Sequence, residues 1–204
     1  MAGGGTVNLA FNGTIGLEST IKVATNTTLI TSNHNVTISG NKTVQLFVVP
    51  QSVTFVLSNL VLANGLAQGA GGAISNNGTV QVIGCLFTNN GAKGEDGGQN
   101  PGQGGAIFNA GTLLMTNASF LTNWAQGGAG SFDPYYHATG SGGNGLGGAI
   151  YNTDYALIDN CLFKANSAIG GWPGSSQYAA PAFDLVENVK EAYNTIRQAQ
   201  QTEK

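Results

Sequence analysis

The chain has 204 residues, of which 32 are glycine, and its formal net charge is −3. Only 8% of the residues are charged and the seven basic residues are scattered, which argues against a nucleic-acid partner or an anionic membrane surface. No apolar stretch has the length of a transmembrane helix, so we expect no membrane span. The first residues do not resemble a signal peptide, so we recognise no export signal in this chain.

Residues 6–65 contain short β-rich segments that are separated by turn residues such as Asn12-Gly13 and Gly40-Asn41. The segments are Val7–Ala10, Ile21–Val23, Thr28–Thr31, Val36–Ser39, Val44–Val49, Val53–Leu57 and Leu60–Ala63. Grouped in threes, they predict two full coils of a solenoid, roughly 20–42 and 43–65, after a partial first coil. The edge of that first coil would be open unless residues 1–15 or a neighbouring chain cover it.

Residues 71–171 repeat one pattern three times. Gly71-Gly72-Ala73-Ile74 returns from Gly104 and again from Gly147. Each copy is followed by Phe-x-x-Asn at the same spacing, and each holds three short segments with period-two alternation. Self-similarity at this period is typical of stacked repeat architectures.

These features predict an all-β fold, a right-handed parallel β-helix with three strands per coil and five to six coils. Each strand would pair with its equivalent one coil away, at about 4.8 Å. Identical side chains would then stack as ladders, because equivalent residues lie directly above one another. The predicted ladders are Ile74, Ile107 and Ile150; Phe87, Phe120 and Phe163; Asn76, Asn109 and Asn152; Asn90, Asn123 and Asn166; and Ala92, Ala125 and Ala168.

The turns and cysteines give two further expectations. Gly78 and Gly111 occupy a turn position that we expect to need positive φ, where the third repeat has Asp154. Cys85 and Cys161 share one column with an alanine between them, so they would lie about 9.6 Å apart, beyond the reach of a disulfide. We expect two buried, reduced thiols. The alternative is a secreted scaffold that is held together by a disulfide.

Two insertions interrupt the repeat at one corner, at Glu95–Gln103 and Ala129–Leu146. Insertions on one side of a solenoid commonly form a binding face. The second insertion holds the densest aromatic segment, which makes candidate surface residues of Asp133, Tyr135, Tyr136 and His137. The alternative is a loop that folds its aromatic side chains back onto the solenoid wall.

The composition changes at Pro181, and residues 181–204 are predicted to form an amphipathic helix after a β-helix domain at 1–180. Asp184 and Glu187 can form a capping box. The apolar stripe that follows is the predicted docking face: Leu185, Val186, Val189, Ala192, Tyr193 and Ile196. We expect this face to cover an end or side of its own solenoid, or to dock on a partner chain.

The Gly-Gly-Ala-Ile and Phe-x-x-Asn motifs of residues 71–166 resemble the repeat of bacterial β-helix surface proteins, including the chlamydial polymorphic outer-membrane proteins. The broader fold resembles the pectin-lyase-like superfold. The resemblance implies an exported protein, extracellular or at the cell surface, with an adhesive or structural role.

The residues themselves argue against catalysis. Residues 1–183 have no arginine, and the lysines Lys22, Lys42, Lys93 and Lys164 do not recur in one column, so the cation of a polysaccharide lyase is missing. No two carboxylates form the facing pair of a glycosidase. His34 and His137 lack partners for a metal, and Glu95, Asp96 and Asp133 fit solvated loop residues better than a calcium site. We expect no cofactor and no metal.

An interaction surface fits the sequence better. Phe108 and Tyr151 hold the same outward position on adjacent coils, where the preceding coil has Ser75, and could stack on a sugar or on a partner aromatic. The sequence therefore predicts a non-enzymatic extracellular scaffold or adhesion domain, which self-associates end to end through the solenoid or the C-terminal helix. The alternative is a β-helix that binds or degrades carbohydrate.

Overall fold

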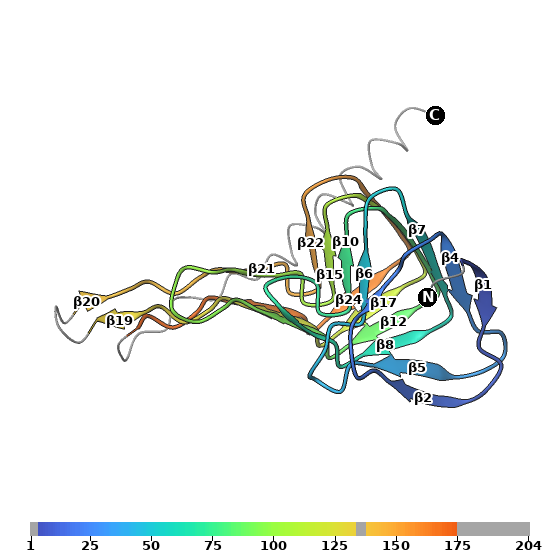
Figure 1. Ribbon diagram of the computed structural model, residues 1–204, viewed down its shortest axis with the longest axis horizontal. Coiled ribbons are helices and arrows are strands. Elements are labelled where there is room, and N and C mark those ends of the chain that lie inside the picture. Colours follow the sequence, from blue (N-terminus) through green and yellow to red (C-terminus); the bar gives the residue numbers. More distant parts are fainter. Residues whose placement is uncertain (1–3, 134–137, 175–204) are drawn as a thin grey trace.

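A computed structural model describes residues 4–133 and 138–174, and every regular element in these residues is a β-strand (Figure 1). The strands form stacked parallel sheets, as the repeat pattern predicts. The predicted docking face at 185–196 lies outside the described residues, as do Tyr135, Tyr136 and His137.

Three sheets form the walls of the solenoid, and in each the strands lie in chain order. The first sheet contains β1 (Gly5–Asn8), β4 (Thr27–Ile30), β7 (Thr54–Ser58), β11 (Thr79–Ile83), β16 (Thr112–Thr116) and β23 (Ala156–Asp159). The second contains β2 (Gly13–Gly16), β5 (Val36–Ser39), β8 (Val61–Ala63), β12 (Leu86–Thr88), β17 (Ser119–Leu121) and β24 (Leu162–Lys164). The third contains β3 (Ile21–Lys22), β6 (Phe47–Val49), β10 (Ile74–Asn76), β15 (Ile107–Asn109) and β22 (Ile150–Asn152).

The register places equivalent residues of successive coils opposite one another. Phe87 pairs with Phe120, and Phe120 with Phe163, and both ring pairs are stacked with centroids 4.6 and 4.9 Å apart. Ile74, Ile107 and Ile150 likewise pair in one column. The phenylalanine and isoleucine ladders are therefore confirmed: the members in the first two repeats belong to the buried apolar core, and Ile150 and Phe163 pack against it. The right-handed winding stays a prediction.

Both asparagine ladders are present and hydrogen-bonded. The Asn76 Nδ2 donates to Asn109 Oδ1 at 2.6 Å, and Asn109 Nδ2 donates to Asn152 Oδ1 at the same distance. In the second ladder, Asn90 Nδ2 donates to Asn123 Oδ1 at 3.0 Å and Asn123 Nδ2 donates to Asn166 Oδ1 at 2.9 Å. Because an amide carries both a donor and an acceptor, each buried asparagine satisfies its neighbour in the next coil.

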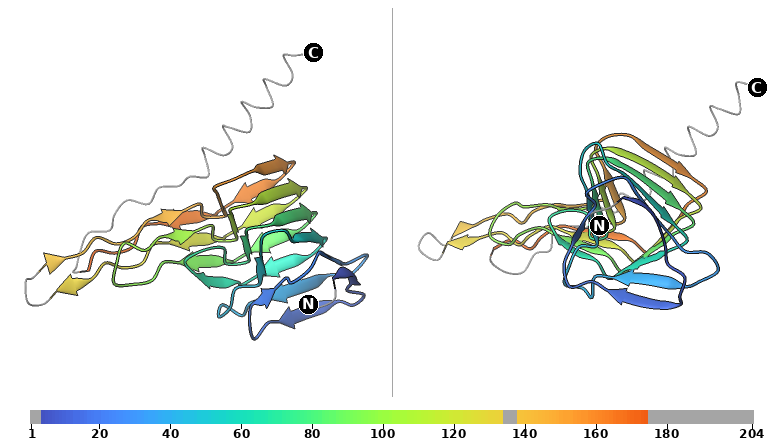
Figure 2. Two further views of the ribbon diagram at one scale, coloured as in Figure 1. Left: turned by 45° about the horizontal axis from the view of Figure 1, so that its top comes forward. Right: turned by 45° about the vertical axis from the view of Figure 1, so that its right-hand side comes forward.

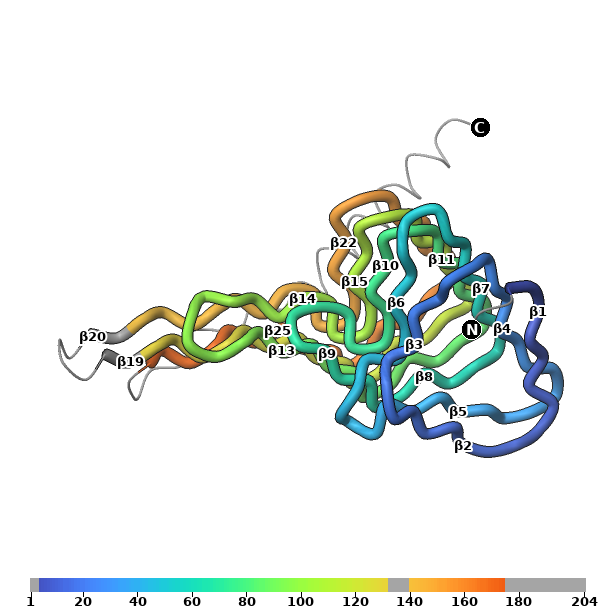
Figure 3. The backbone as a smooth tube through the Cα atoms, in the orientation of Figure 1, coloured from blue at the N-terminus to red at the C-terminus, as the bar shows by residue number. Residues whose placement is uncertain are grey.

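A lateral arm projects from the solenoid between the second and third sheets, and the sequence did not predict it (Figures 1 and 3). Its main sheet contains β9 (Leu66–Gln68), β13 (Gly91–Lys93), β18 (Trp124–Gln126) and β25 (Ser167–Ile169). Further out lie the parallel pair β14 (Gly102–Gln103) and β21 (Gly145–Leu146) and the antiparallel hairpin β19 (Phe132–Asp133) and β20 (Ala138–Thr139). The hairpin lies at the far end of the arm, so the backbone of the second insertion extends away from the solenoid wall instead of folding back onto it.

The arm corrects the place of one predicted ladder. Ala92, Ala125 and Ala168 pair in register as expected, but they lie in the arm and not in the core of the solenoid. The arm is thin because its layers pack backbone against backbone. A Cβ on Gly127 would lie 1.9 Å from the carbonyl oxygen of Gly143, which leaves no room for a side chain.

One further expectation, positive φ at a turn position, was wrong. Gly78 and Gly111 do not have positive φ, and neither does Asp154. Glycine is needed at the first two positions because the backbone of the preceding coil is close: a Cβ on Gly111 would lie 2.3 Å from the oxygen of Gly78. Positive φ occurs instead at the leading glycine of each Gly-Gly-Ala-Ile motif, with φ between 64° and 68° at Gly71, Gly104 and Gly147.

Candidate interaction site

The first coil has open edges, which makes it the candidate site. Among residues 4–133 and 138–174, the strands β1, β2 and β3 each lie at the end of their sheet and pair with a neighbour on one side only. The left view of Figure 2 shows the blue N-terminal strands at one end of the stack, below the layers that follow. Residues 5–16 therefore form the first coil and do not cover it. An unpaired parallel edge offers free backbone donors and acceptors to a further strand.

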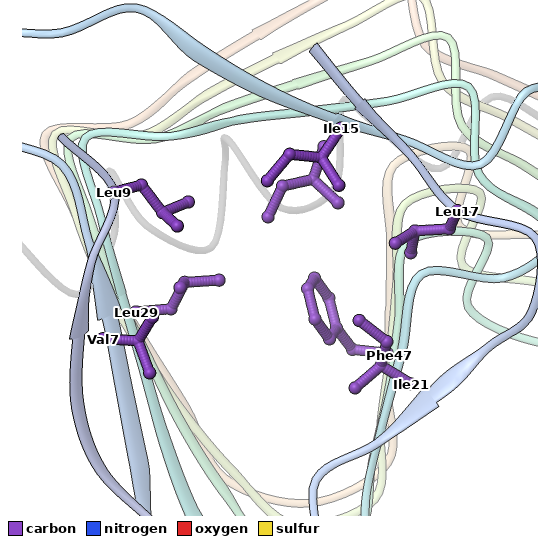
Figure 4. A pocket seen from close by; sticks show the side chains of 8 residues that line it. Val7, Leu9, Ile15, Leu17, Ile21, Leu29 and Phe47 are labelled. Carbon is purple, nitrogen blue, oxygen red and sulfur yellow. The ribbon is translucent and has the colours of Figure 1, made fainter. Parts of the chain in front are cut away.

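The interior of the first coil is also open and apolar. A cavity of about 90 Å³ is lined by eight apolar side chains, which point toward one another in Figure 4: Val7, Leu9, Ile15, Leu17, Ile21, Leu29, Ile38 and Phe47. Val7 is 37% exposed, whereas Leu29 in the next coil is 2% exposed. This cavity is the open end of the apolar core, which continues from here through the stack.

The sequence explains why a cavity forms at this end. The second and third coils fill their interior with Phe47 and Phe55, whose ring centroids lie 5.0 Å apart. The residue below Phe47 in the same column is Ile21, and the column of Phe55 continues to Thr27 and Gly5. The smaller side chains leave space that larger ones fill elsewhere. Sequence reasoning predicted the open edge but missed the cavity, and these column replacements were the signal that could have found it.

Phe108 and Tyr151 lie together on the outer face of the third sheet, as predicted. They pair in register above Ser75, and their rings are stacked with centroids 6.0 Å apart and planes 25° apart. Both side chains are half-buried. The two rings face each other, so one face of each ring is used within the pair. This geometry supports mutual packing of the two coils more directly than a platform for a sugar.

The predicted loop residues are only partly described. Asp133 lies in β19, where its backbone pairs with Ala138; Tyr135, Tyr136 and His137 fall outside the described residues. Asp96 stabilises the arm: its Oδ2 accepts a 2.8 Å bond from Lys93 Nζ and its Oδ1 accepts one from the Ala129 amide. The bond from Lys93, and to a smaller extent the bond from the Ala129 amide, lower the pKa of Asp96 below its usual value. Both oxygens are engaged within the protein, in keeping with a loop residue.

The two cysteines are free, and Cys85 is buried while Cys161 is only half-buried. Cys161 was expected to be buried, but it lies in the last described coil, where no further described strand covers it. Burial raises the pKa of the Cys85 thiol to about 11 and also raises the pKa of Cys161. Neither thiol therefore has the thiolate character of a nucleophile.

Within the described residues, no three His, Cys, Asp or Glu side chains gather closely enough to hold a metal ion. The part of the chain that the structure describes also contains no helix that is long and apolar enough to span a membrane. The arrangement at the first coil is suited to binding by apolar contact and strand pairing.

Comparison with protein families gives one match: residues 84–110 fit the repeat of the Chlamydia polymorphic membrane proteins. This segment runs from the turn before β12 through the arm to the end of β15, and it contains Phe87, Asn90 and the motif that begins at Gly104. The resemblance that the motifs indicated is thus confirmed for one repeat of the chain. The comparisons with curated proteins and with solved structures each gave no match.

Proposed function

We propose that this chain is a non-enzymatic extracellular scaffold, a right-handed β-solenoid that associates with a second copy of itself through its first coil. The observation that carries the proposal is the open apolar end of the stack, with its cavity and its three strand edges that no described strand pairs with. The surface location is supported by the match to a repeat of polymorphic membrane proteins.

Two properties of the first coil support a second copy as the partner. It carries one exposed charge of each sign, Glu18 and Lys22, so a two-fold arrangement can place each charge against its opposite in the other copy. The coil extends from the start of β1, at Gly5, to the end of β3, at Lys22. Its number of residues is close to the 20–30 that a standard interface contributes per side. Burial of the cavity lining removes apolar surface from water and drives the association.

The experiment is light scattering of the complete chain over a wide range of concentration. We expect the mass to rise from 20.8 kDa for one chain to twice that value. The variant Val7→Asp places a charge at the mouth of the cavity, and should stay monomeric because the charge would have to lose its water in the dimer. Val7 is already 37% exposed, so this change should not unfold the protein.

The matched control is Ile83→Asp, which adds the same charge at a position that is 44% exposed on the outer face of the first sheet. This control should associate like the wild type. A wild-type chain that is monomeric at every concentration would refute the proposal, and so would equal dissociation of the two variants.

A further inference from the structure

The opposite end of the stack is also open in the described residues. The inward side chains of the last coil are partly exposed: Ile150, Ala156, Ile158, Cys161 and Phe163. The equivalent residues one coil earlier are at most 1% exposed: Ile107, Leu113, Met115, Ala118 and Phe120. The difference arises because the earlier positions have a strand on both sides and the last ones do not.

The outer rim of this coil has a second unusual property. One outward column changes from polar to apolar at this coil, where Ile169 follows Gln68, Lys93 and Gln126. Leu162 ends a second outward column, which also contains Val61, Leu86 and Ser119. Leu162 is 54% exposed and Ile169 is 40% exposed. A solvated rim would favour polar residues here, as the earlier coil has. The rim of the last coil is therefore apolar at these two positions, and together with the exposed inward side chains it offers a surface on which an apolar segment can pack.

The chain itself supplies such a surface. Thirty residues follow Gly174, and 181–204 carry the apolar stripe. Gly174 donates its amide to the oxygen of Gly140, so the described chain ends on the arm, only five residues after β25 of the last coil. The connection Ser175–Ala182 has eight residues and can span up to about 28 Å. This connection has more residues than the five that lead from the end of β25 to Gly174, so it can return to the last coil.

We infer that the apolar stripe of residues 184–199 packs on the open C-terminal end of its own solenoid and covers the last coil. A helix of about 17 residues is roughly 25 Å long and 10 Å wide, which suits the end of a single coil. Terminal repeats of solenoids need such a cover with a polar outer face. Together with the proposed dimer, this cover leaves only the first coil free, which gives a closed pair of chains and no filament.

The test uses Cys161 as a reporter, because its thiol lies at the proposed contact and Cys85 lies deep in the same column. Labelling of each thiol with iodoacetamide at alkaline pH is followed by mass spectrometry in the complete chain. The variant Val189→Asp/Ile196→Asp places two charges on the stripe. The control Asn194→Asp/Gln198→Asp places the same charges on the opposite face of the predicted helix.

We expect Cys161 to be labelled at least tenfold faster in the stripe variant than in the control, while Cys85 stays protected in both. Rates for Cys161 within twofold of each other would overturn the inference. Protection of Cys161 that disappears on dilution would also overturn it, because the segment would then dock on another copy.

A second variant tests the other side of the contact and does not threaten the fold. Ile169 lies at the rim on the outward side of β25 and is 40% exposed, so Ile169→Asp should leave the solenoid intact. It should nevertheless speed the labelling of Cys161, whereas Ile83→Asp should not. Equal labelling in these two variants contradicts the inference even if the stripe variant is unfolded.

Discussion

The asparagine ladder at the corner between the second sheet and the arm predicts a large effect from one substitution, Asn123→Ala. Asn123 is fully buried and its side chain makes four hydrogen bonds. Its Nδ2 donates to Asn166 Oδ1 at 2.9 Å and to the Phe87 oxygen at 3.1 Å. Its Oδ1 accepts from the backbone amide of Asn90 at 3.1 Å and from Asn90 Nδ2 at 3.0 Å.

Alanine removes all four bonds and leaves the Asn90 backbone amide buried without an acceptor. Such an orphaned donor costs about 1–3 kcal/mol, and each of the other lost bonds contributes about 1 kcal/mol. Asn90 Nδ2 keeps its bond to the oxygen of Leu62, so this amide loses only one of its two hydrogen bonds. We therefore expect the free energy of unfolding to fall by about 3–5 kcal/mol.

The assay is urea unfolding followed by far-ultraviolet circular dichroism. The control is Gln126→Ala in the same coil, where the side chain points outward and is half-buried, and where we expect a change within about 0.5 kcal/mol. A loss for Asn123→Ala below about 1 kcal/mol, or one equal to the control, would refute the argument that the ladder satisfies buried backbone groups.

Two further predictions concern the glycines and the arm. Gly105→Ala should prevent folding, because its Cβ would lie 2.2 Å from the oxygen of Gly148. In the control Gly69→Ala, the new Cβ meets no atom within 4 Å, so the free energy of unfolding should fall by only about 1 kcal/mol despite the positive φ. Soluble yield and thermal unfolding compare the two variants, and similar stability would contradict the close-contact argument. The bond from Lys93 and the amide of Ala129 lower the pKa of Asp96 below 3.8, so its contribution to the arm is complete above that pH and is lost as the pH falls through the lowered value. The NMR shift of the Ala129 amide should titrate in this acidic window and not in Asp96→Asn; identical curves would rule out this role of Asp96.

The solenoid was predictable because identical residues recur where the fold stacks them. In a parallel stack, each strand pairs with the equivalent strand one coil away, so the register follows from alignment of the repeats. Phe87, Phe120 and Phe163 could therefore be placed above one another from their spacing alone. The weaker coils of residues 6–65 were located from short β-rich segments between turn residues, and β2 was missed because Asn12-Gly13 was interpreted as a turn only.

The arm was not predictable from the same pattern. Beyond its main sheet, the segments of the arm are rich in glycine and carry few side chains that could mark an inward or outward face. Their packing depends on backbone contacts between residues far apart in sequence, such as the amide of Gly128 with the oxygen of Asn100, at 2.9 Å. Periodicity in the sequence cannot report a contact of this kind.

The sequence by itself determined which residues of the three clear repeats share a column, because the fold repeats with the period of the motif and places equivalent residues above one another. Only the tertiary structure decided what lies at the limits of those columns. The cavity at the first coil, the exposure of the last coil and the direction of the arm all depend on where neighbours are missing or where backbones meet. Those are properties of the assembled stack, and no single repeat contains them.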